Sequence, residues 1–274
     1  KIQKIEDKRK AIQIKTEKLQ ADRNLISKEI GEMKAKGKDT ENLLEKVTSI
    51  KNQLEKNEEE LTAIQQELNE LIIVIPNIPH ESVPDGSTEE DNQPIREWGE
   101  KPSFDFKIND HVDLGESLEQ IDFDSATQIT SSRFVVMKGQ IARLHRALIQ
   151  FMLDIHISEH GYQEVNVPYL VNTDSCTNTG QLPKFKEDLF HIKDQDFYLI
   201  PTAEIPVTNI VKDKIINDIE LPLKFVCHSP CFRSEAGSYG KDTRGMIRQH
   251  QFEKVELVQI VQPENSYNVL EELT

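Results

Sequence analysis

Apolar residues recur at every seventh position near the start of this chain, and this rhythm limits what the segment can fold into. The first run consists of Ile5, Ile12, Leu19, Ile26 and Met33. A second run fills both seam positions of the repeat, in alternating steps of four and three: Leu43, Val47, Ile50, Leu54, Asn57, Leu61, Ile64, Leu68, Leu71 and Ile75. Such spacing keeps one stripe of a helix against a partner helix. The segment therefore predicts a coiled coil.

Signals for the end of one helix and the start of the next separate the two runs. Gly37 suits a helix C-terminus, and Asp39 or Thr40 can cap the following helix. We therefore expect residues 1–75 to form an antiparallel hairpin of two helices. Each arm has roughly 36 residues, so at 1.5 Å per residue the hairpin would extend about 50 Å. Such a hairpin reaches outward and encloses nothing.

Charge is divided unevenly along the chain, which has 33 Lys+Arg, 48 Asp+Glu and a net charge of −15. Residues 1–38 carry 12 basic and 6 acidic residues (+6), and residues 39–75 carry 3 and 9 (−6), so the whole deficit lies in residues 76–274. An evenly acidic surface would repel nucleic acid, but this one is not even. Two interpretations stay open: two helices of opposite charge that attract each other, or a basic ridge that grips a phosphate backbone through Lys8, Arg9, Lys15, Lys18, Arg23 and Lys28.

The composition favours a reducing, cytoplasmic location. Three cysteines cannot complete a disulfide framework, and the chain opens with Lys1-Ile2-Gln3-Lys4 rather than an apolar signal. The longest apolar run, Leu71 to Ile75, is far short of the ~20 residues needed to cross a bilayer. We therefore expect no membrane association.

Prolines mark the end of the hairpin. Pro76, Pro79 and Pro84 precede an acidic stretch, so we expect residues 76–125 to connect the hairpin to a second domain over residues 126–274. In that domain a long helix ended by Gly161 should present one apolar face, consisting of Ile141, Leu144, Leu148, Phe151 or Met152, and Ile155. A strand from Tyr162 to Pro168 should follow.

Polar residues at two-residue spacing interrupt three apolar segments of this second domain. They are Thr202 with Glu204, Arg233 with Glu235, and Phe252 with Lys254 and Glu256. If each segment is extended, the members of a set share one face. A solvated outer face explains any single pair. Three such sets favour a common polar floor, where a ligand ammonium could partner the carboxylates.

These residues resemble the class II aminoacyl-tRNA synthetases. Phe232 to Glu235, followed by Arg248-x-x-x-Phe252, is similar to the second signature motif of the class, and Gly139 to Pro168 is similar to the first. The features that resemble the bacterial-type seryl-tRNA synthetases in particular are the N-terminal hairpin, Thr179-Gly-Gln-Leu-Pro-Lys-Phe185 and Thr202-Ala203-Glu204. The resemblance implies an α+β protein, in which a two-helix antiparallel coiled coil precedes an antiparallel sheet flanked by helices. The third motif would lie beyond Thr274, so this catalytic domain is expected to be incomplete, both ends of the chain to be cut, and the chain alone to be inactive.

The resemblance also implies a two-step reaction. Serine would attack ATP to form seryl-adenylate and pyrophosphate, and the seryl group would pass to serine tRNA, or to selenocysteine tRNA as well. Arg233 would be the catalytic clamp on the α-phosphate and the serine carboxylate. The implied ATP-binding residues are Arg233, Ser234, Glu235, Arg248 and Phe252, and the implied serine-binding residues are Thr202, Ala203, Glu204 and Glu256.

The family's partners follow in the same way. The hairpin would bind the long variable arm of serine tRNA through Arg9, Lys15, Lys18 and Arg23, and the first motif would form a homodimer. Mg²⁺ would accompany ATP, but its main acidic ligands belong to the third motif, so this chain is expected to hold no metal. Cys227-His228-x-x-Cys231 offers three metal ligands without a fourth, which favours a structural thiol pair over zinc.

Two other functions compete with this interpretation. A non-catalytic tRNA-binding or regulatory paralogue would need no polar floor. A coiled-coil scaffold joined to an unrelated α+β domain would bind no ATP. Gly240-Lys241 is followed by Asp242 and so does not complete a phosphate-binding loop of the Walker type.

Overall fold

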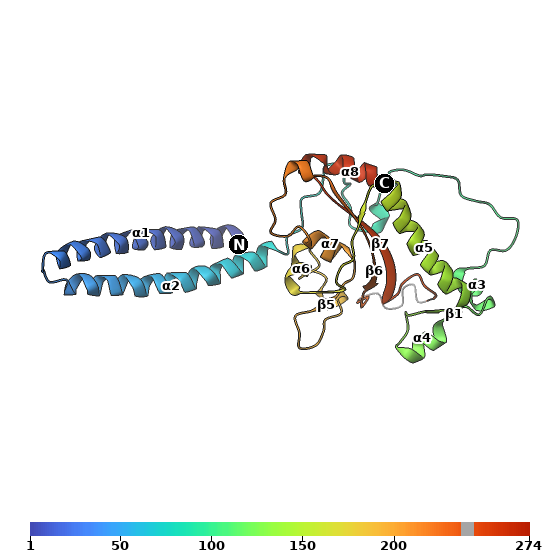
Figure 1. Ribbon diagram of the computed structural model, residues 1–274, viewed down its shortest axis with the longest axis horizontal. Coiled ribbons are helices and arrows are strands. Elements are labelled where there is room, and N and C mark those ends of the chain that lie inside the picture. The colour runs from blue at the N-terminus through green and yellow to red at the C-terminus, as the bar shows by residue number, and fades with distance from the viewer. Residues whose placement is uncertain (237–243) are drawn as a thin grey trace. The chain divides into compact units, whose positions relative to one another are not determined.

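The computed structural model describes residues 1–236 and 244–274, and the chain divides into two compact units (Figure 1). The units are Lys1–Arg96 and Glu97–Thr274, so the division falls inside the expected connector, residues 76–125. Gly240-Lys241 lies outside the described residues. Each unit has its own architecture.

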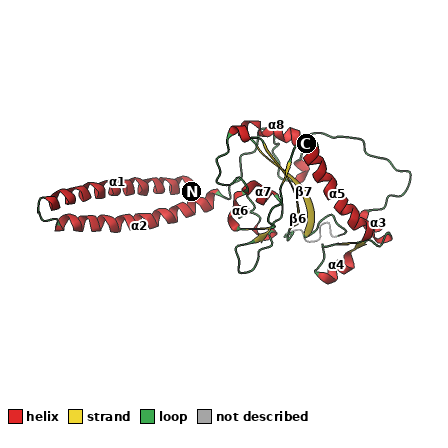
Figure 2. Cartoon of the chain, viewed as in Figure 1, coloured by secondary structure: helices red, strands yellow, loops and turns green. Residues whose placement is uncertain are grey.

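The predicted helical hairpin is confirmed. It consists of α1 (Ile2–Ala35) and α2 (Glu41–Ile72), which lie side by side in Figure 2. The chain leaves α1 through a Schellman turn: the Lys38 N–H donates to the Met33 carbonyl at 3.0 Å and Gly37 has a φ of +67°. The Asp39 carboxylate then accepts from the Glu41 N–H at 3.0 Å, which satisfies one of the unpaired amides at the start of α2.

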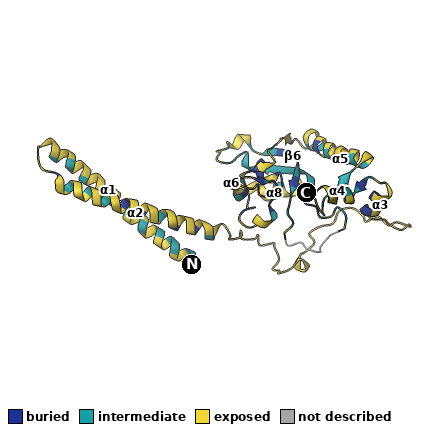
Figure 3. Cartoon of the chain, turned by 90° about the horizontal axis from the view of Figure 1, so that it is seen from below, coloured by how far each residue is buried: buried dark blue, intermediate teal, exposed yellow. Residues whose placement is uncertain are grey.

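The seam of the hairpin follows the predicted heptads, most of whose residues are buried or half-buried, and includes one polar layer. Figure 3 colours the hairpin by burial. Ile64 and Leu68 are 5% and 6% exposed, but Ile75 lies beyond the end of α2 and is 52% exposed, so its assignment to the seam was wrong. Asn57, 5% exposed, donates to the Thr16 hydroxyl at 3.1 Å. A buried polar pair of this kind fixes the register of two helices at some cost in stability.

Within the part of the chain that the structure describes, the second unit contains five α-helices and five short strands before the β6–β7 hairpin and one helix after it. In chain order the helices and strands are α3 (His111–Ser117), β1 (Ile121–Asp122), α4 (Phe123–Ile129), β2 (Val136–Met137), α5 (Gly139–Ser158), β3 (Gln163–Glu164), β4 (Leu170–Val171), α6 (Thr173–Asn178), β5 (Tyr198–Leu199), α7 (Glu204–Asn209), β6 (Leu223–Phe232), β7 (Gln251–Ile260) and α8 (Ser266–Leu273). Single 3-10 turns occur at η2 (Lys186–Asp188), η3 (Asp218–Glu220) and η4 (Pro263–Asn265), and η1 (Glu89–Asp91) lies in the first unit. β1 pairs with β2 and β4 pairs with β5.

The central sheet has the order β3-β6-β7. β6 and β7 form an antiparallel ladder from Leu223 opposite Ile260 to Phe232 opposite Gln251, which confirms the predicted antiparallel pairing. β3 adds a parallel strand beside β6, so the sheet is mixed. The strand predicted from Tyr162 to Pro168 is shorter than expected, because only Gln163 and Glu164 pair with β6.

A helix packs against each face of this sheet. α5 covers one face through Ile149 and Leu153, which contact Tyr162 and Val226. α7 covers the other face, where Val207 belongs to a buried cluster with Phe225, Cys227, Ala203 and Val167. Side chains alternate between the faces of a strand, so the residues of β7 divide between these two environments.

The predicted apolar face of α5 does not face the sheet. Leu144, Leu148 and Phe151 are 53%, 50% and 59% exposed, whereas Leu153 is 7% exposed. The helix has apolar residues on two sides, and helical periodicity identifies such sides without telling which one the sheet covers. The second side is left open in the single chain.

We predict that shortening a seam side chain will destabilise the hairpin far more than shortening an exposed one. Leu68→Ala should lower the free energy of unfolding by about 2–4 kcal/mol, because Leu68 is 6% exposed and its removal leaves a cavity. Leu44→Ala, at 45% exposure on the same helix, is the matched control and should cost under about 1 kcal/mol. Urea unfolding followed by circular dichroism at 222 nm measures both. Equal losses would contradict the seam assignment.

Candidate active site

Three polar or aromatic residues of β7 form the floor of the candidate site. Phe252, Lys254 and Glu256 alternate along the strand and lie opposite Cys231, Ser229 and Cys227 of β6. These three partners on β6 are 0% exposed, small side chains. Small cross-strand neighbours leave room for long side chains on the same face. The predicted common face for the set of β7 is therefore confirmed.

A hydrogen-bonded network joins this floor to the segment after β5. The Lys254 ammonium lies 2.5 Å from Glu256 Oε2 and donates to the Thr202 hydroxyl at 2.7 Å. Thr202 donates in turn to Glu256 Oε2 at 2.6 Å. Because Thr202 is buried and the side chains of Lys254 and Glu256 are only partly exposed, charge-assisted bonds of this kind orient them strongly. Sequence analysis placed Lys254 on this face but did not assign it to the site.

The strand assumed for Thr202 and Glu204 is wrong. β5 ends at Leu199, and Glu204 is the first residue of helix α7. The reason is local: the Thr202 hydroxyl accepts from the Glu204 N–H at 3.2 Å and so begins the helical turn. Ala203, placed with the serine-binding residues, is 0% exposed and belongs to the core below the site.

Arg233 and Glu235 do not share a strand face either. β6 ends at Phe232, and Glu235 has a φ of +54°, in the left-handed region. After this turn, the side chains of Arg233 and Glu235 line the same hollow. The Arg233 guanidinium lies over the Phe252 ring at 5.1 Å, and Glu235 Oε2 accepts from Arg248 at 2.9 Å.

Ser234 is turned away to a supporting role. Its N–H donates to the Asp188 carbonyl at 2.9 Å, and its hydroxyl donates to the Glu187 carbonyl. These bonds tie the residue between Arg233 and Glu235 to the 3-10 turn Lys186–Asp188. Ser234 therefore holds the arginine and the glutamate in place, and its hydroxyl is already bonded.

A hollow of about 370 Å³ collects the predicted residues from these separate segments. Of the predicted ATP- and serine-binding residues it is lined by Thr202, Glu204, Arg233, Glu235 and Arg248. Its other lining residues include Lys254 from β7 and Gln181 and Phe185 from the segment before η2. The hollow is thus lined by two arginines, a lysine and three acidic residues, including Asp188, which suits a ligand with both anionic and cationic groups.

Phe252 also lines a second hollow, of about 350 Å³, together with Gln249. Gln249 is 7% exposed and its Oε1 atom has no hydrogen-bond partner among the residues described. A buried acceptor without a partner is costly unless a ligand or water supplies a donor. The second hollow therefore offers an aromatic ring and an acceptor.

The four basic residues predicted to bind RNA on the hairpin differ in their surroundings. Lys15, Lys18 and Arg23 are exposed, whereas Arg9 is partly buried in the seam. The Arg9 guanidinium binds both carboxylate oxygens of Glu6 at 2.8 Å, and this hydrogen bonding raises its pKa. Arg9 is thus held by its own helix more firmly than the other three.

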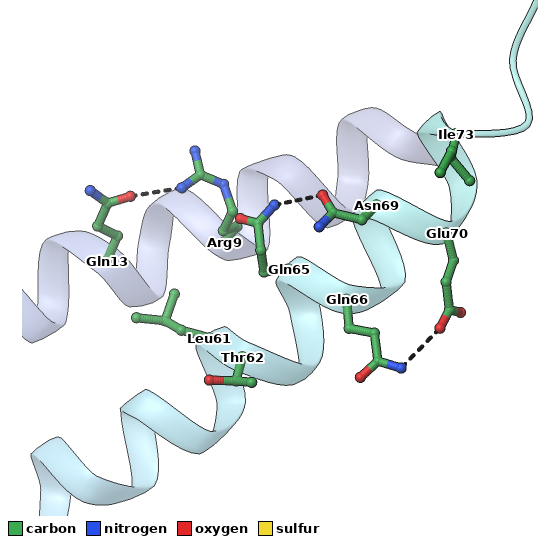
Figure 4. A pocket seen from close by; sticks show the side chains of 9 residues that line it. All are labelled: Arg9, Gln13, Leu61, Thr62, Gln65, Gln66, Asn69, Glu70 and Ile73. Atoms are coloured by element: carbon green, nitrogen blue, oxygen red, sulfur yellow. Dashed lines mark hydrogen bonds between the residues drawn. The ribbon is translucent and has the colours of Figure 1, made fainter. Parts of the chain in front are cut away.

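Arg9 also lines a groove of about 680 Å³ between α1 and α2 (Figure 4). The other lining residues are mainly amides and aliphatic side chains: Gln13, Leu61, Thr62, Gln65, Gln66, Asn69, Glu70 and Ile73. Figure 4 shows Arg9 bonded to Gln13, Gln65 bonded to Asn69, and Gln66 bonded to Glu70. Groups that satisfy each other in this way offer no set for acid–base or metal chemistry.

The cysteines of β6 belong to the core. Cys227 and Cys231 are each 0% exposed, and burial, aided by Cys231 and Glu256, raises the pKa of the Cys227 thiol to about 11. His228 lies on the opposite face and its Nε2 is 2.8 Å from Glu253 Oε2. Within residues 1–236 and 244–274, no group of three or more His, Cys, Asp or Glu side chains could hold a metal ion.

Comparison with known proteins identifies the class of this fold and site. Residues 185–274 match the tRNA synthetase class II core domain (G, H, P, S and T). This range contains the β6–β7 ladder and every lining residue of the first hollow except Gln181. Residues 1–79, which contain the hairpin, match the seryl-tRNA synthetase N-terminal domain. The second unit is therefore a class II aminoacyl-tRNA synthetase core.

Similar proteins specify the family. The chain is 62% identical to a serine--tRNA ligase of Cellvibrio japonicus (strain Ueda107) and 59% identical to one of Legionella pneumophila (strain Lens), and it covers 64% of each. All 274 residues align with the first and 271 with the second. A crystal structure of seryl-tRNA synthetase from Pyrococcus horikoshii complexed with ATP superimposes on 99% of this chain with a TM-score of 0.88 at 35% identity, and 65% of that protein is covered. The chain belongs to the seryl-tRNA synthetase family.

Two further facts accompany this assignment. The chain spans about two thirds, or 64%, of the length of the serine--tRNA ligases that it matches. In the part of the chain that the structure describes, no helix has the length and apolarity needed to cross a bilayer.

Proposed function

We propose that this chain serves the ATP-dependent attachment of L-serine to tRNA through a seryl-adenylate intermediate. The observation that carries the proposal is the hollow that brings Arg233 and Arg248 together with Thr202 and Glu204. The serine--tRNA ligases and the ATP-complexed synthetase that resemble the chain support the same assignment. A non-catalytic paralogue has no comparable support, because binding RNA alone requires no such set of opposed charges.

The serine end of the hollow is the network around Thr202. The ammonium of serine can donate to the carboxylate of Glu204, which lines the hollow. Glu256 is held against Thr202 and Lys254 below. A site that bonds the serine hydroxyl rejects alanine, because the polar groups of the site would be left unpaired. Lys254 orients Thr202 and Glu256, the two groups that would discriminate serine from alanine.

The nucleotide end is formed by the guanidinium groups. Arg233, held over Phe252, can bind the serine carboxylate and an α-phosphate oxygen at once, since a planar guanidinium presents several donors. When the serine carboxylate oxygen attacks the α-phosphorus, the phosphorus–oxygen bond to pyrophosphate breaks and negative charge grows on the phosphoryl oxygens. Arg233 offsets that charge, and Arg248, with Glu235 beside it, binds the outer phosphates. The second hollow, with Phe252 and the Gln249 acceptor, suits a planar base that carries an amino group.

Magnesium is expected with ATP, but the residues described do not form a site for it. They include no group of three or more acidic or other ligating side chains placed to hold a metal. Glu256, on the floor, is already bonded to Lys254 and Thr202. We therefore assign no step to a metal held by this chain.

The hairpin is proposed to bind the long variable arm of serine tRNA, and selenocysteine tRNA in the same way. Lys15, Lys18 and Arg23 are exposed on the basic helix α1 and can contact phosphates without breaking bonds within the protein. The net charge of −15 of the whole chain does not oppose this, because residues 1–38 carry a local +6. The exposure of these three residues supports the basic ridge over two helices that only attract each other.

The exposed side of α5 is proposed as the homodimer interface. Leu144, Leu148 and Phe151 are half-exposed apolar side chains on one side of a helix whose other side contacts the sheet. Apolar stripes of this kind on a helix usually mark a protein interface. A cytoplasmic enzyme with two such chains is the assembly that the proposal requires.

We predict that Arg233→Ala will lower serine-dependent exchange of pyrophosphate into ATP by at least about 100-fold, because the charge it offsets exists near the transition state. The assay uses a protein that contains this chain and has the full length of its relatives. Arg233→Lys, which keeps the charge but loses the planar fork, should retain part of the activity. Full exchange by the alanine variant would overturn the role of Arg233 and with it the proposed function.

We predict that the triple variant Lys15→Glu, Lys18→Glu and Arg23→Glu will bind serine tRNA weakly and with a flatter dependence on salt. The matched control reverses Lys46, Lys51 and Lys56, which are exposed on α2 and change the net charge equally. Filter binding across a salt series compares the two variants, and pyrophosphate exchange should stay normal in both. Equal weakening by both variants would show that net charge, rather than the ridge of α1, governs binding.

We predict that Leu148→Glu combined with Phe151→Glu will convert a dimer into monomers, because both charges would be buried in the interface. Analytical ultracentrifugation measures the change. Ile215→Glu with Ile219→Glu is the control, since these side chains are 100% and 94% exposed elsewhere on the second unit. A variant that remains dimeric would place the interface on another surface.

A further inference from the structure

Residues at the start of α3 contact three consecutive residues, 244–246, which precede Arg248 at the nucleotide end of the site. Arg244 forms ion pairs with Asp110 at 2.5 Å and with Asp113 at 2.7 Å. The Met246 N–H donates to His111 Nε2 at 2.8 Å. These contacts join segments that are more than 130 residues apart in the chain.

Gly245, between the two gripped residues, leaves no room for a side chain. A Cβ atom there would lie 2.1 Å from His111 Nε2 and 2.7 Å from Val112 Cγ2. Its φ of +79° is also in the left-handed region. The backbone of Gly245 is therefore pressed directly against the imidazole, and the fit depends on His111 staying where it is.

The grip has a fixed support. Asp110 accepts from the Val112 and Asp113 N–H groups with Oδ1 and from Arg244 with Oδ2. It therefore caps α3 and holds Arg244 at the same time. Behind α3, Gly115 packs against Ile121 of β1.

The same support continues into α5. The Lys138 N–H donates to the Gln120 carbonyl at 2.8 Å, and Gln120 Oε1 accepts from Ile141 in the first turn of α5 at 2.9 Å. Figure 1 shows α3, β1 and α4 gathered at one end of α5. α3 thus connects the long helix of the unit to residues 244–246.

The gripped residues are directly connected to the site. Gln249 Nε2 donates to the Gly245 carbonyl at 2.9 Å, which closes the short turn that contains Arg248. Arg248 in turn binds Glu235 and lines the hollow. A shift of residues 244–246 would therefore move the guanidinium of Arg248 relative to Arg233.

We propose that Asp110, His111 and Asp113 are positioning residues for Arg248 and so set the affinity of the site for the triphosphate of ATP. The proposal rests on the proposed function, in which Arg248 binds the outer phosphates. His111 contributes an acceptor, and its Nε2 must therefore be unprotonated, with the ring proton on Nδ1. Asp110 and Asp113 contribute charge and hold Arg244.

The test compares His111→Leu, which removes the acceptor, with His111→Gln, which supplies an amide oxygen in its place. In pyrophosphate exchange by the full-length protein, His111→Leu should raise the KM for ATP about fivefold, the effect of one neutral hydrogen bond, with the KM for serine unchanged. His111→Gln should restore most of the loss. Hydrogen exchange at the Met246 amide should accelerate in the leucine variant and slow again in the glutamine variant.

Other outcomes separate this proposal from the proposed function. If the wild-type protein binds ATP in a calorimeter but shows no serine-dependent exchange, the proposed function fails. The Kd for ATP of the two His111 variants then still tests whether the start of α3 positions Arg248. Equal ATP affinity in the wild type and His111→Leu overturns the proposal that His111 positions Arg248. So does a parallel rise in the KM for ATP and for serine with a lower unfolding midpoint, since that pattern indicates a general structural role.

Discussion

The pairing of β6 with β7 is the interaction on which the rest of the second unit depends. Ten residues of each strand form one antiparallel ladder, and the ladder decides which side chain stands opposite which. Cys227, Ser229 and Cys231 are small and fully buried, so Glu256, Lys254 and Phe252 can occupy the space above them. A shift of one residue would turn all three to the opposite face of the sheet, because side chains alternate between faces. The unusual cysteines of β6 are thus explained by the space they leave, without a metal.

The helix α5 has apolar residues on two sides, and only one of these sides packs against the sheet. One side of α5 must contact Val226 and Tyr162, while the other presents Leu148 and Phe151 to a second chain in the dimer that we propose. The helix therefore carries more apolar surface than one face of a monomer needs. The start of the same helix is bonded to Gln120, which follows α3, so the proposed dimer helix and the turn that contains Arg248 share one support. In the hairpin, by contrast, stability comes from a narrow seam with an Asn57–Thr16 layer, and Lys15, Lys18 and Arg23 stay exposed on α1, where we propose that RNA binds.

Much of the local structure could be predicted, and the failures have physical causes. Strict heptads and a glycine stop signal located α1 and α2, since nothing but the partner helix competes with that pattern. The two-residue spacing on β7 was correct because a long ladder enforces it. The same spacing misled at Thr202 and Glu204, where a hydroxyl began a helix, and at Arg233 and Glu235, where a left-handed turn followed the strand. Spacing reports a shared face only while the strand continues, so the residues were right and the geometry assumed for them was wrong.

The sequence by itself determined the coiled-coil arm, the uneven distribution of charge, the motif residues and their resemblance to one family, because these depend on local periodicity and on residue identity. Only the tertiary structure decided which side of α5 is covered, that Arg9 is bound in the seam, and that Lys254 links Thr202 to Glu256. It also brought Asp110, His111 and Asp113 against Arg244–Met246, a contact between segments more than 130 residues apart. No local pattern encodes such a contact, since it depends on how the intervening elements fold back on one another.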